Sequence, residues 1–256
     1  MGASMNNLEL EQLLNKQLNT QAIRDYCPNG LQVEGRTGVQ HIVTGVTASQ
    51  ALIDQAVALN ADAILVHHGY FWKGEAPSVR GMKRHRLKAL LANDINLYAY
   101  HLPLDIAPVL GNNAQLAELL GIQVTGPLEP DNALSVAMRG ELTTPLSGTE
   151  LTANIEQKLG RSVLHVGETG PQLIRHIGWC TGGGQGYIEL AAEQGMDAFI
   201  SGEVSEQTVH SARELGIHFF AAGHHATERY GVKALGEWLA VEHGLTVQFV
   251  DIDNPA

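Results

Sequence analysis

The spacing of hydrophobic and polar positions along the chain predicts alternating helices and strands. Leucines at helical spacing predict a helix over residues 7–18. The apolar run 63–66 is typical of a buried strand. The other elements expected from the same patterns are helices over 83–92, 113–120, 148–160 and about 226–243, a helix starting near Ser205, and a last strand over 245–252. This alternation predicts an α/β fold.

Two segments, 46–68 and 181–203, share one order of strand, loop, helix, turn and strand. A constant shift aligns them without a gap and pairs Asp62 with Asp197. Chance similarity is the alternative, because α/β folds reuse the β-α-β unit. An ungapped match that keeps polar residues favours an internal duplication, so we expect two related α/β lobes.

We expect the first lobe to be built from two separate segments of the chain and the second from one. Pro127 and Pro130 mark a crossing into the second lobe, and the chain is expected to cross back near 224–230. The first lobe would therefore comprise residues 1–126 plus about 229–256, and the second residues 127–228.

Histidines and carboxylates gather where the predicted strands end. His67 and His68 follow the apolar run 63–66, and the ends of parallel strands are where open α/β folds bind ligands. An isolated His-His pair is more often one packed and one solvated histidine. The metal-binding interpretation gains weight here because other strand ends also offer ligands.

Two further His-carboxylate pairs have the same spacing. His224 and Glu228 lie four residues apart at a predicted helix start and would share one face, although an ordinary surface pair has the same spacing. When "INLYAYHLPLD", 95–105, is compared with "IHFFAAGHHATE", 217–228, and one extra residue is allowed, His101 matches His224 and Asp105 matches Glu228. Because Pro103 lies between His101 and Asp105, we expect a strand-to-loop exit there rather than a helix.

Together the expected ligands are three imidazoles and two carboxylates. One hydrolytic ion rarely takes five protein ligands, whereas two ions about 3.5 Å apart can share a bridging carboxylate. Mixed imidazole and carboxylate donors suit zinc, manganese, iron, cobalt or nickel. The residues predicted to hold two divalent ions per chain are His67, His68, Asp105, His224 and Glu228.

The charge and the cysteine count limit the classes of binding partner and the cellular compartment that we expect. The formal net charge is −11, which argues against binding to duplex nucleic acid but leaves room for a small phosphorylated substrate in a local basic pocket. Two cysteines form no disulfide framework, so we expect a reducing cytoplasm. We expect neither a membrane span nor a signal peptide. Met-Gly-Ala-Ser before Met5 has the look of an added leader.

Several motifs together resemble one family. They are "GVTASQALIDQA", "DAILVHHGYFWKG", "NLYAYHLPLD", "DAFISGEVSEQTVHSARE" and "GHHATERYG". From about Leu8 to Ala256 the chain resembles the dinuclear metal-centre proteins called GTP cyclohydrolase 1 type 2 homologues. The resemblance implies two α/β lobes with the metals in the cleft between them, and a ring-shaped homo-hexamer built as a trimer of dimers. It also implies the five ligands given above, with Glu228 bridging the ions and His101 beside them.

The expected function is metal-dependent hydrolysis of a small, nucleotide-like substrate. His101 or His225 would transfer the proton, because imidazoles titrate near neutral pH. The alternative is a metal-binding ring scaffold that recruits partners without catalysis. The sequence has no dedicated guanine-binding pattern. Residues 181–184, Thr-Gly-Gly-Gly, are expected to form a tight turn rather than an anion cradle, and Glu203 to line the cleft without ligating.

Overall fold

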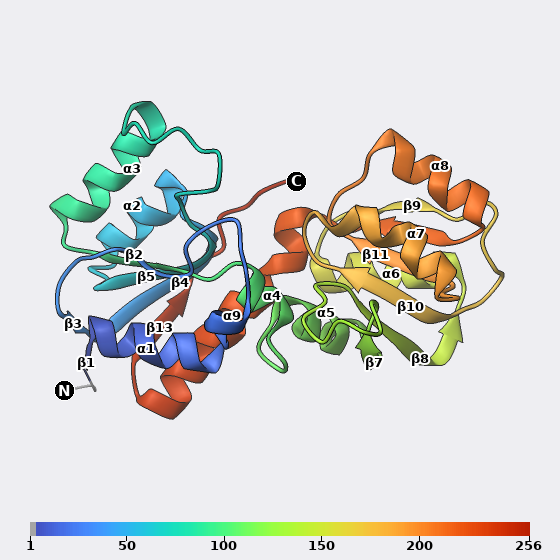
Figure 1. Cartoon of the computed structure of the whole chain (residues 1–256), viewed down its shortest axis with the longest axis horizontal. Helices are drawn as coiled ribbons and strands as arrows, with labels where there is room; N and C mark the ends of the chain where they lie inside the picture. The colour runs from blue at the N-terminus through green and yellow to red at the C-terminus, as the bar shows by residue number, and fades with distance from the viewer. Residues whose placement is uncertain (1–3) are drawn as a thin grey trace. The chain divides into compact units, whose positions relative to one another are not determined.

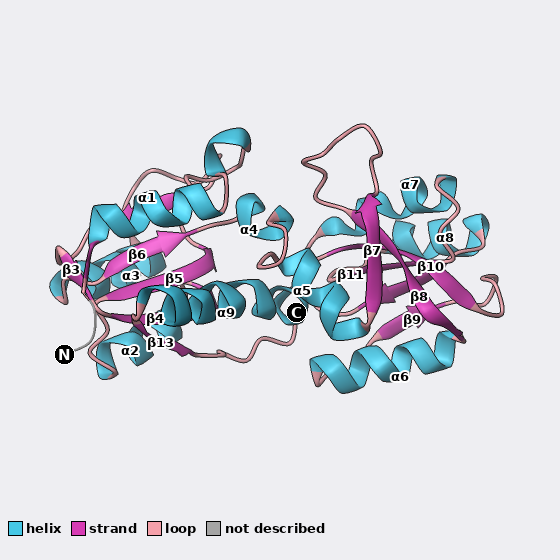
Figure 2. Ribbon diagram, turned by 90° about the horizontal axis from the view of Figure 1, so that it is seen from below, coloured by secondary structure: helices cyan, strands magenta, loops and turns pink. Residues whose placement is uncertain are grey.

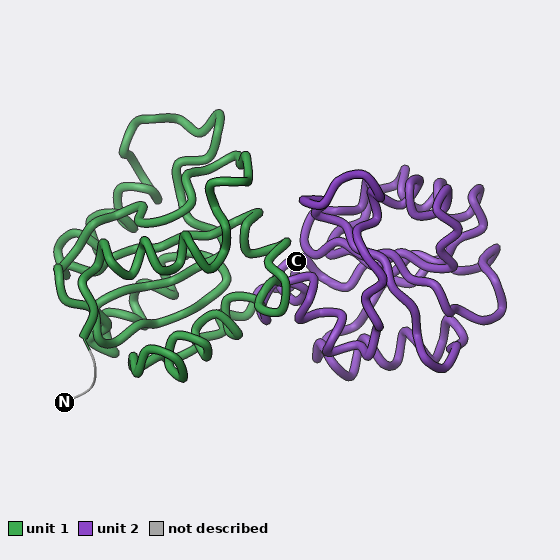
Figure 3. The backbone as a smooth tube through the Cα atoms, turned by 60° about the horizontal axis from the view of Figure 1, so that its bottom comes forward, with its two compact units in different colours: residues 1–111, 231–253 green, residues 112–230, 254–256 purple. Residues whose placement is uncertain are grey.

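The computed structural model describes residues 4–256, so three of the four residues of the expected leader lie outside it. The chain forms two compact units (Figure 3). Unit 1 comprises residues 1–111 and 231–253, and unit 2 comprises residues 112–230 and 254–256. The boundary at 230 falls within the long helix α9, His224–His243.

The elements of each unit follow in chain order (Figure 1). Unit 1 contains β1 (Met5–Asn6), α1 (Asn7–Gln17), η1 (Thr20–Ala22), β2 (Gly30–Val33), β3 (Gly38–Val39), β4 (His41–Thr47), α2 (Gln50–Ala58), β5 (Ala63–His68), α3 (Gly81–Ala92), β6 (Asn96–Ala99), α4 (Leu102–Ile106), most of α9 and β13 (Thr246–Phe249). Unit 2 contains α5 (Asn112–Leu120), β7 (Ile122–Pro127), β8 (Met138–Leu146), α6 (Gly148–Leu159), β9 (Leu164–Val166), β10 (Ile174–Cys180), η2 (Gly184–Tyr187), α7 (Ile188–Glu193), β11 (Ala198–Ser201), α8 (Glu206–Leu215), β12 (His218–Ala221) and the start of α9.

Unit 1 is a five-stranded sheet between two layers of helices. Its strand order is β13-β4-β5-β6-β2, with only β2 antiparallel to its neighbour. Side chains alternate along β5: Ala63 and Leu65 pack with α1 and α9, whereas Ile64 and Val66 pack with α2 and α3. Strand β5 is therefore buried on both faces, which explains why its sequence is a continuous apolar run.

Unit 2 has a six-stranded sheet of order β7-β8-β10-β11-β12-β9 (Figure 2). Strands β10, β11 and β12 are parallel, and β7, β8 and β9 pair antiparallel with their neighbours. Helices α5 and α6 pack on one face of this sheet, and α7 and α8 on the other. Each unit thus places adjacent parallel strands in a helix-covered sheet, β13, β4, β5 and β6 in unit 1 and β10, β11 and β12 in unit 2. The protein is a mixed α/β fold with several sheets.

The aligned aspartates of the two segments make the same hydrogen bonds. Asp62 accepts from the backbone N–H groups of Gln40 and His41, both at 2.9 Å. Asp197 accepts from the backbone N–H groups at positions 175 and 176, at 2.9 and 2.8 Å. Asp62 thereby links the turn before β5 to the start of β4, and Asp197 links the turn before β11 to the start of β10. The two aligned aspartates therefore have the same structural role.

The helices and strands predicted above are confirmed, with bounds shifted by one to three residues. The lobe division at 126 and 229 stays a prediction. In the structure, helix α5 and strand β7, which ends at Pro127, both belong to unit 2. Among residues 4–256, no helix is both long enough and apolar enough to cross a membrane.

Candidate metal centre

The candidate ligands of unit 1 lie where its parallel strands end. His67 is the penultimate residue of β5, fully buried, and its Nδ1 lies 2.9 Å from the carbonyl oxygen of Tyr100. A carbonyl only accepts, so Nδ1 donates and Nε2 carries the lone pair. His67 Nε2 lies 3.5 Å from Asp105 Oδ1, which brings a nitrogen and an oxygen donor together.

His68 points to the other face of β5, yet its ring remains beside that of His67. Pairing of β5 with β6 stops at Val66, whereas pairing with β4 continues to His68 opposite Thr47. The two imidazole centroids are 4.5 Å apart, and His68 Nδ1 lies 3.1 Å from Thr47 Oγ1. At a strand end, adjacent side chains of opposite orientation can therefore serve one site.

A third imidazole joins this pair. One ring nitrogen from each of His67, His68 and His101 falls within a group whose members all lie within 4.8 Å of one another. His101 comes from the end of β6, and its ring centroid is 5.2 Å from that of His67. The three histidines expected at the strand ends of unit 1 therefore converge.

The expectation that His101 to Asp105 would not be helical is wrong. Residues Leu102–Ile106 form the short helix α4, with His101 at its N-cap. Pro103 lies in the first turn, where its missing N–H has no intrahelical partner to lose. The backbone N–H of Asp105 donates to the carbonyl of His101 at 3.2 Å, so this turn fixes the two residues relative to each other.

A network that the sequence did not reveal holds the His101 ring. Asp25 Oδ1 lies 2.7 Å from His101 Nδ1, and the Asp25 side chain is almost fully buried. Asn29 accepts from the backbone N–H of His101 at 2.7 Å and donates to Asp25 at 2.9 Å. Trp72 packs edge-on against the imidazole, with centroids 4.8 Å apart. No periodicity signals these contacts, because Asp25 and His101 are 76 residues apart.

Unit 2 offers a second set of donors at the start of α9. His224 Nε2 lies 3.2 Å from Glu228 Oε2, as the spacing of four residues predicts for one helix face. Glu228 is buried. The other ring nitrogen, Nδ1, lies 2.8 Å from Oε1 of Glu203, which follows β11. His224 is thus held between two carboxylates.

These carboxylates change the acid-base behaviour of His224. The hydrogen bond to Glu228 raises the pKa of His224 to about 9 against the opposing effect of burial, and Glu203 adds to the rise. Two carboxylates around one imidazole concentrate negative charge, which is the electrostatic environment that a divalent cation prefers.

The glycine-rich turn after β10 makes room for these side chains. Gly182 has a φ of +65°, and a Cβ there would collide with Glu228 Oε1 and lie 2.9 Å from His224 Nε2. Its backbone N–H donates to Thr227 at 3.0 Å, and its carbonyl accepts from Gly202 at 2.9 Å. Residues 181–184 form a turn, as expected, and the missing side chain at Gly182 provides a cradle for the Glu228 carboxylate.

The donors of both units suit divalent transition metals. Imidazole nitrogens with carboxylate oxygens are typical ligands of zinc, manganese and iron. A ligating histidine almost always donates its second nitrogen to a carboxylate, carbonyl or water. His67 meets this requirement through Tyr100 and His224 through Glu203. The residues therefore fit a metal ion, and the cradle at Gly182 accommodates the carboxylate that would bind it.

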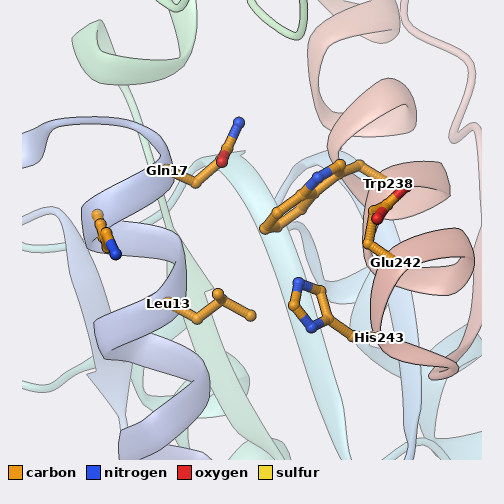
Figure 4. Close-up of a pocket in the computed structure, with 6 residues that line it drawn as sticks. Leu13, Gln17, Trp238, Glu242 and His243 are labelled. Atoms are coloured by element: carbon orange, nitrogen blue, oxygen red, sulfur yellow. The ribbon is translucent and has the colours of Figure 1, made fainter.

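Other candidates lie apart from these donors. His225 is largely buried, its backbone N–H donates to Ala256 at 3.1 Å, and its ring belongs to none of the convergent donor groups found among residues 4–256. A cavity of about 380 Å³ lies between α1 and α9 within unit 1 (Figure 4). It is lined by Leu13, Lys16, Gln17, Trp238, Glu242 and His243, none of which joins a convergent donor group in the described chain.

The fold and the donors define the class first: a mixed α/β protein with His, Asp and Glu groups able to bind metal ions. The model of the Duf34/NIF3 (NGG1p interacting factor 3) family matches residues 5–255, and the chain belongs to this family. It is 67% identical to a Haemophilus influenzae protein over 252 residues, covering 98% of this chain and 100% of the relative. It is 65% identical to an Escherichia coli K12 protein with the same coverage. Both relatives carry the name "GTP cyclohydrolase 1 type 2 homolog".

Solved structures agree with this assignment. The structure titled "protein ybgI, unknown function" superposes with a TM-score of 0.95 at 65% identity, covering 98% of this chain and all of the other. The protein TTHA1606 from Thermus thermophilus superposes with a TM-score of 0.88 at 32% identity and the same coverage. The family resemblance found in the sequence motifs is confirmed.

Proposed function

We propose that the chain binds two divalent metal ions and uses them to hydrolyse a small, nucleotide-like substrate. The observation that carries this proposal is the way the imidazoles are held. Tyr100 fixes the Nδ1 of His67 and Glu203 that of His224, so that each Nε2 serves as a ligand atom beside a carboxylate. The residues that would hold the ions are His67, His68, Asp105, His224 and Glu228, and Glu228 would be shared by both ions.

The residues support hydrolysis in distinct ways. When bound, divalent ions supply Lewis-acid chemistry that lowers the pKa of water and polarises the bond to be cleaved. His101 would take a proton at Nε2, since its Nδ1 is engaged by Asp25. Trp72, packed edge-on against His101, offers an apolar wall beside the site. The name carried by the relatives suggests a purine nucleotide as the substrate.

A turnover screen tests this function. Protein reconstituted with manganese, iron or zinc is offered nucleotides, phosphoesters and cyclic amides, with the metal-free protein as control. We expect hydrolysis of at least one small substrate by the metal-loaded protein only. Full metal loading without turnover of any of these classes would contradict the hydrolase and support the ring scaffold that recruits partners.

We also propose that the two sets of donors arose from one ancestral half by internal duplication. The matched hydrogen bonds of Asp62 and Asp197 support this, as does burial of the aligned alanines Ala56 and Ala191. In this proposal the metal site lies in a cleft to which both halves contribute. Separate expression of residues 112–230 tests the dependence: this fragment should bind metal far more weakly than the whole chain, and equal affinity would contradict a shared site.

The proposed assembly is a homo-hexamer, a ring made as a trimer of dimers. The support is the family membership, and closed symmetric rings are a common solution for soluble oligomers. Light scattering coupled to size-exclusion chromatography tests the proposal. A particle of six chains is expected, and a stable monomer at micromolar concentration would contradict it.

A further inference from the structure

The buried carboxylate of Asp25 has four hydrogen-bond partners. Its oxygens accept from the backbone N–H groups of Tyr26, at 2.6 Å, and Leu102, at 2.9 Å, and from the side-chain amide of Asn29, at 2.9 Å. His101 Nδ1 is the fourth partner, at 2.7 Å. Three of these partners are N–H groups that can only donate, so the carboxylate is held as an acceptor on both oxygens.

The direction of the fourth hydrogen bond follows. An oxygen that only accepts requires an N–H opposite it, so His101 carries its proton on Nδ1. In the neutral ring Nε2 then has a lone pair, and the His101 ring lies 5.2 Å from that of His67 and 5.9 Å from that of His68, centroid to centroid. The tautomer of His101 is therefore set by a residue on a different loop.

The backbone around the pair makes this orientation rigid. Asn29 accepts from the N–H of His101 at 2.7 Å, and the N–H of Lys73 donates to the carbonyl of Tyr26 at 2.6 Å. The Trp72 indole donates to Gly69 at 3.2 Å, which fixes the ring that packs against His101. The loops around 25–29 and 69–73 thus hold His101 from two sides.

The charge of Asp25 agrees with the geometry. Burial acts to raise the pKa of Asp25, but the hydrogen bonds from His101 and Asn29, with the charge of His101, outweigh it and hold the pKa below its ordinary value. A buried carboxylate that stays ionised stabilises an imidazolium beside it.

We propose that Asp25 is a positioning residue for the hydrolysis. It holds His101 as the Nδ1–H tautomer, so that Nε2 acts as the proton acceptor beside His67 and His68 rather than as a further metal ligand. This inference rests on the proposed function. As the oxygen of the attacking water bonds to the substrate, Nε2 takes one proton from that water, and the imidazolium later returns the proton to the leaving group.

The neighbouring thiol does not offer a competing mechanism. Cys27 lies near Asp25 and His101, with one donor atom of each residue within 4.8 Å of the others, which superficially matches a Cys-His-Asp arrangement. Burial, with the charge of Asp25, raises the pKa of Cys27 to about 12. The thiol stays protonated at neutral pH and is a poor nucleophile, because the thiolate is the reactive form.

Nitrogen-15 solid-state NMR of histidine-labelled, metal-free protein reads the tautomer directly, independently of turnover and particle size. The spectrum is taken at a pH where the imidazoles are neutral, and His101 is identified by the signals missing from His101→Gln. We expect a protonated Nδ1 and an unprotonated Nε2. A protonated Nε2 in the unmodified protein would overturn the proposal without any variant having to fold.

The second experiment compares the variant Asp25→Asn with the matched control Asp54→Asn on α2. We expect a mixed tautomer at His101 in Asp25→Asn, unchanged metal content, and a fall in kcat on the order of 10²-fold with little change in KM for any substrate found by the screen. The control should match the unmodified protein. An unchanged tautomer would overturn the proposal, and so would loss of metal as large as in His67→Ala, because Asp25 would then orient a ligand.

The two failures are separable. If the metal-loaded protein turns over no substrate while His101 remains the Nδ1–H tautomer and Asp25→Asn disturbs it, the proposed function fails and the positioning by Asp25 stands as a structural fact. If turnover occurs but Asp25→Asn leaves kcat unchanged, the hydrolase stands and the role of Asp25 in it is wrong.

Discussion

Three parallel strands of unit 1, β4, β5 and β6, correspond to β10, β11 and β12 of unit 2, but the side chains at their ends differ. The middle strand of unit 1, β5, ends in His67 and His68, whereas the aligned positions after β11 in unit 2 are Gly202 and Glu203. The strand before it ends in Thr47 in unit 1 and leads to Gly182 in unit 2. Unit 1 therefore carries a group of three imidazoles at its strand ends, whereas unit 2 carries one imidazole between two carboxylates.

The third strand of each unit is followed by the feature that they share most closely. Both β6 and β12 lead to a helix with a histidine at its start and a carboxylate four residues on. In unit 2 that histidine, His224, faces Glu228. In unit 1 the histidine, His101, is held by Asp25, and Asp105 faces His67 instead. In the proposed function, the same spacing would therefore give a pair of ligands in unit 2, and a proton acceptor plus a ligand in unit 1.

The largest effect is expected from Glu228→Gln. An amide is a poor bridge between cations, so metal affinity should fall by more than the roughly 10–100-fold that loss of a residue supporting a ligand typically causes. Glu237→Gln, at an exposed position on the same helix, is the matched control and should bind metal normally. Isothermal titration of both variants with zinc measures the difference, and equal affinities would remove Glu228 from the site.

The next effect in size is expected from Gly182→Ala. The added Cβ would collide with the Glu228 carboxylate at a positive φ, so metal affinity should drop about tenfold or more and stability should fall by about 1–3 kcal/mol. Gly186→Ala is the matched control, because a Cβ there meets nothing within 4 Å. Urea unfolding and metal titration check both effects. A variant that binds metal as well as the control would show that the cradle is not needed.

A smaller effect on metal affinity is expected when the residue that holds a proposed histidine ligand is changed. His224 is held by a carboxylate and His68 by a hydroxyl, so the two histidines can be compared. Glu203→Gln removes the charged partner of His224 and should weaken metal binding about 10–100-fold. Thr47→Val removes only a neutral hydroxyl beside His68 and should cost less, because hydrogen bonds to charged groups are stronger. Glu206→Gln, at a fully solvated side chain, controls for the change of charge. Equal losses of metal affinity in Glu203→Gln and Thr47→Val would contradict the idea that a charged partner supports a histidine ligand more strongly than a neutral one.

The smallest effect concerns a histidine stack in unit 2 away from the ligands. His165 stacks on Phe220 and lies 2.9 Å from His218, nitrogen to nitrogen. Burial, with the charge of His218, lowers the pKa of His165 from its ordinary 6.5. The unfolded chain therefore binds this proton more readily, so the stability that the neutral ring contributes is present above pH 6.5 and is lost as the pH falls through the folded-state pKa.

The contribution of His165 to the pH dependence of stability is measured on metal-free protein, so that metal binding does not affect the result. The urea midpoint of the unmodified protein should drop slightly more between about pH 7.5 and 5.5 than that of His165→Gln. A steeper drop in the variant would reverse the sign of the pKa shift and contradict the interpretation.

The sequence predicts the helices, the parallel strands and the convergence of histidines because these depend on local periodicity and on strand ends. It predicts the pairing of His224 with Glu228 because both lie on one helix. It misses helix α4, because the rule that proline breaks helices does not hold in a first turn. It also misses Asp25 and the cradle at Gly182, since both depend on contacts between segments far apart in the chain.

The most direct test of the central proposal is the number of metal ions per chain. Protein stripped with a chelator, reconstituted with manganese, iron or zinc and then desalted is analysed for metal by mass spectrometry and for protein by amino-acid analysis. If the five proposed ligands hold two ions, the metal content should reach a plateau near two ions per chain. A tight plateau at one ion would contradict the dinuclear centre.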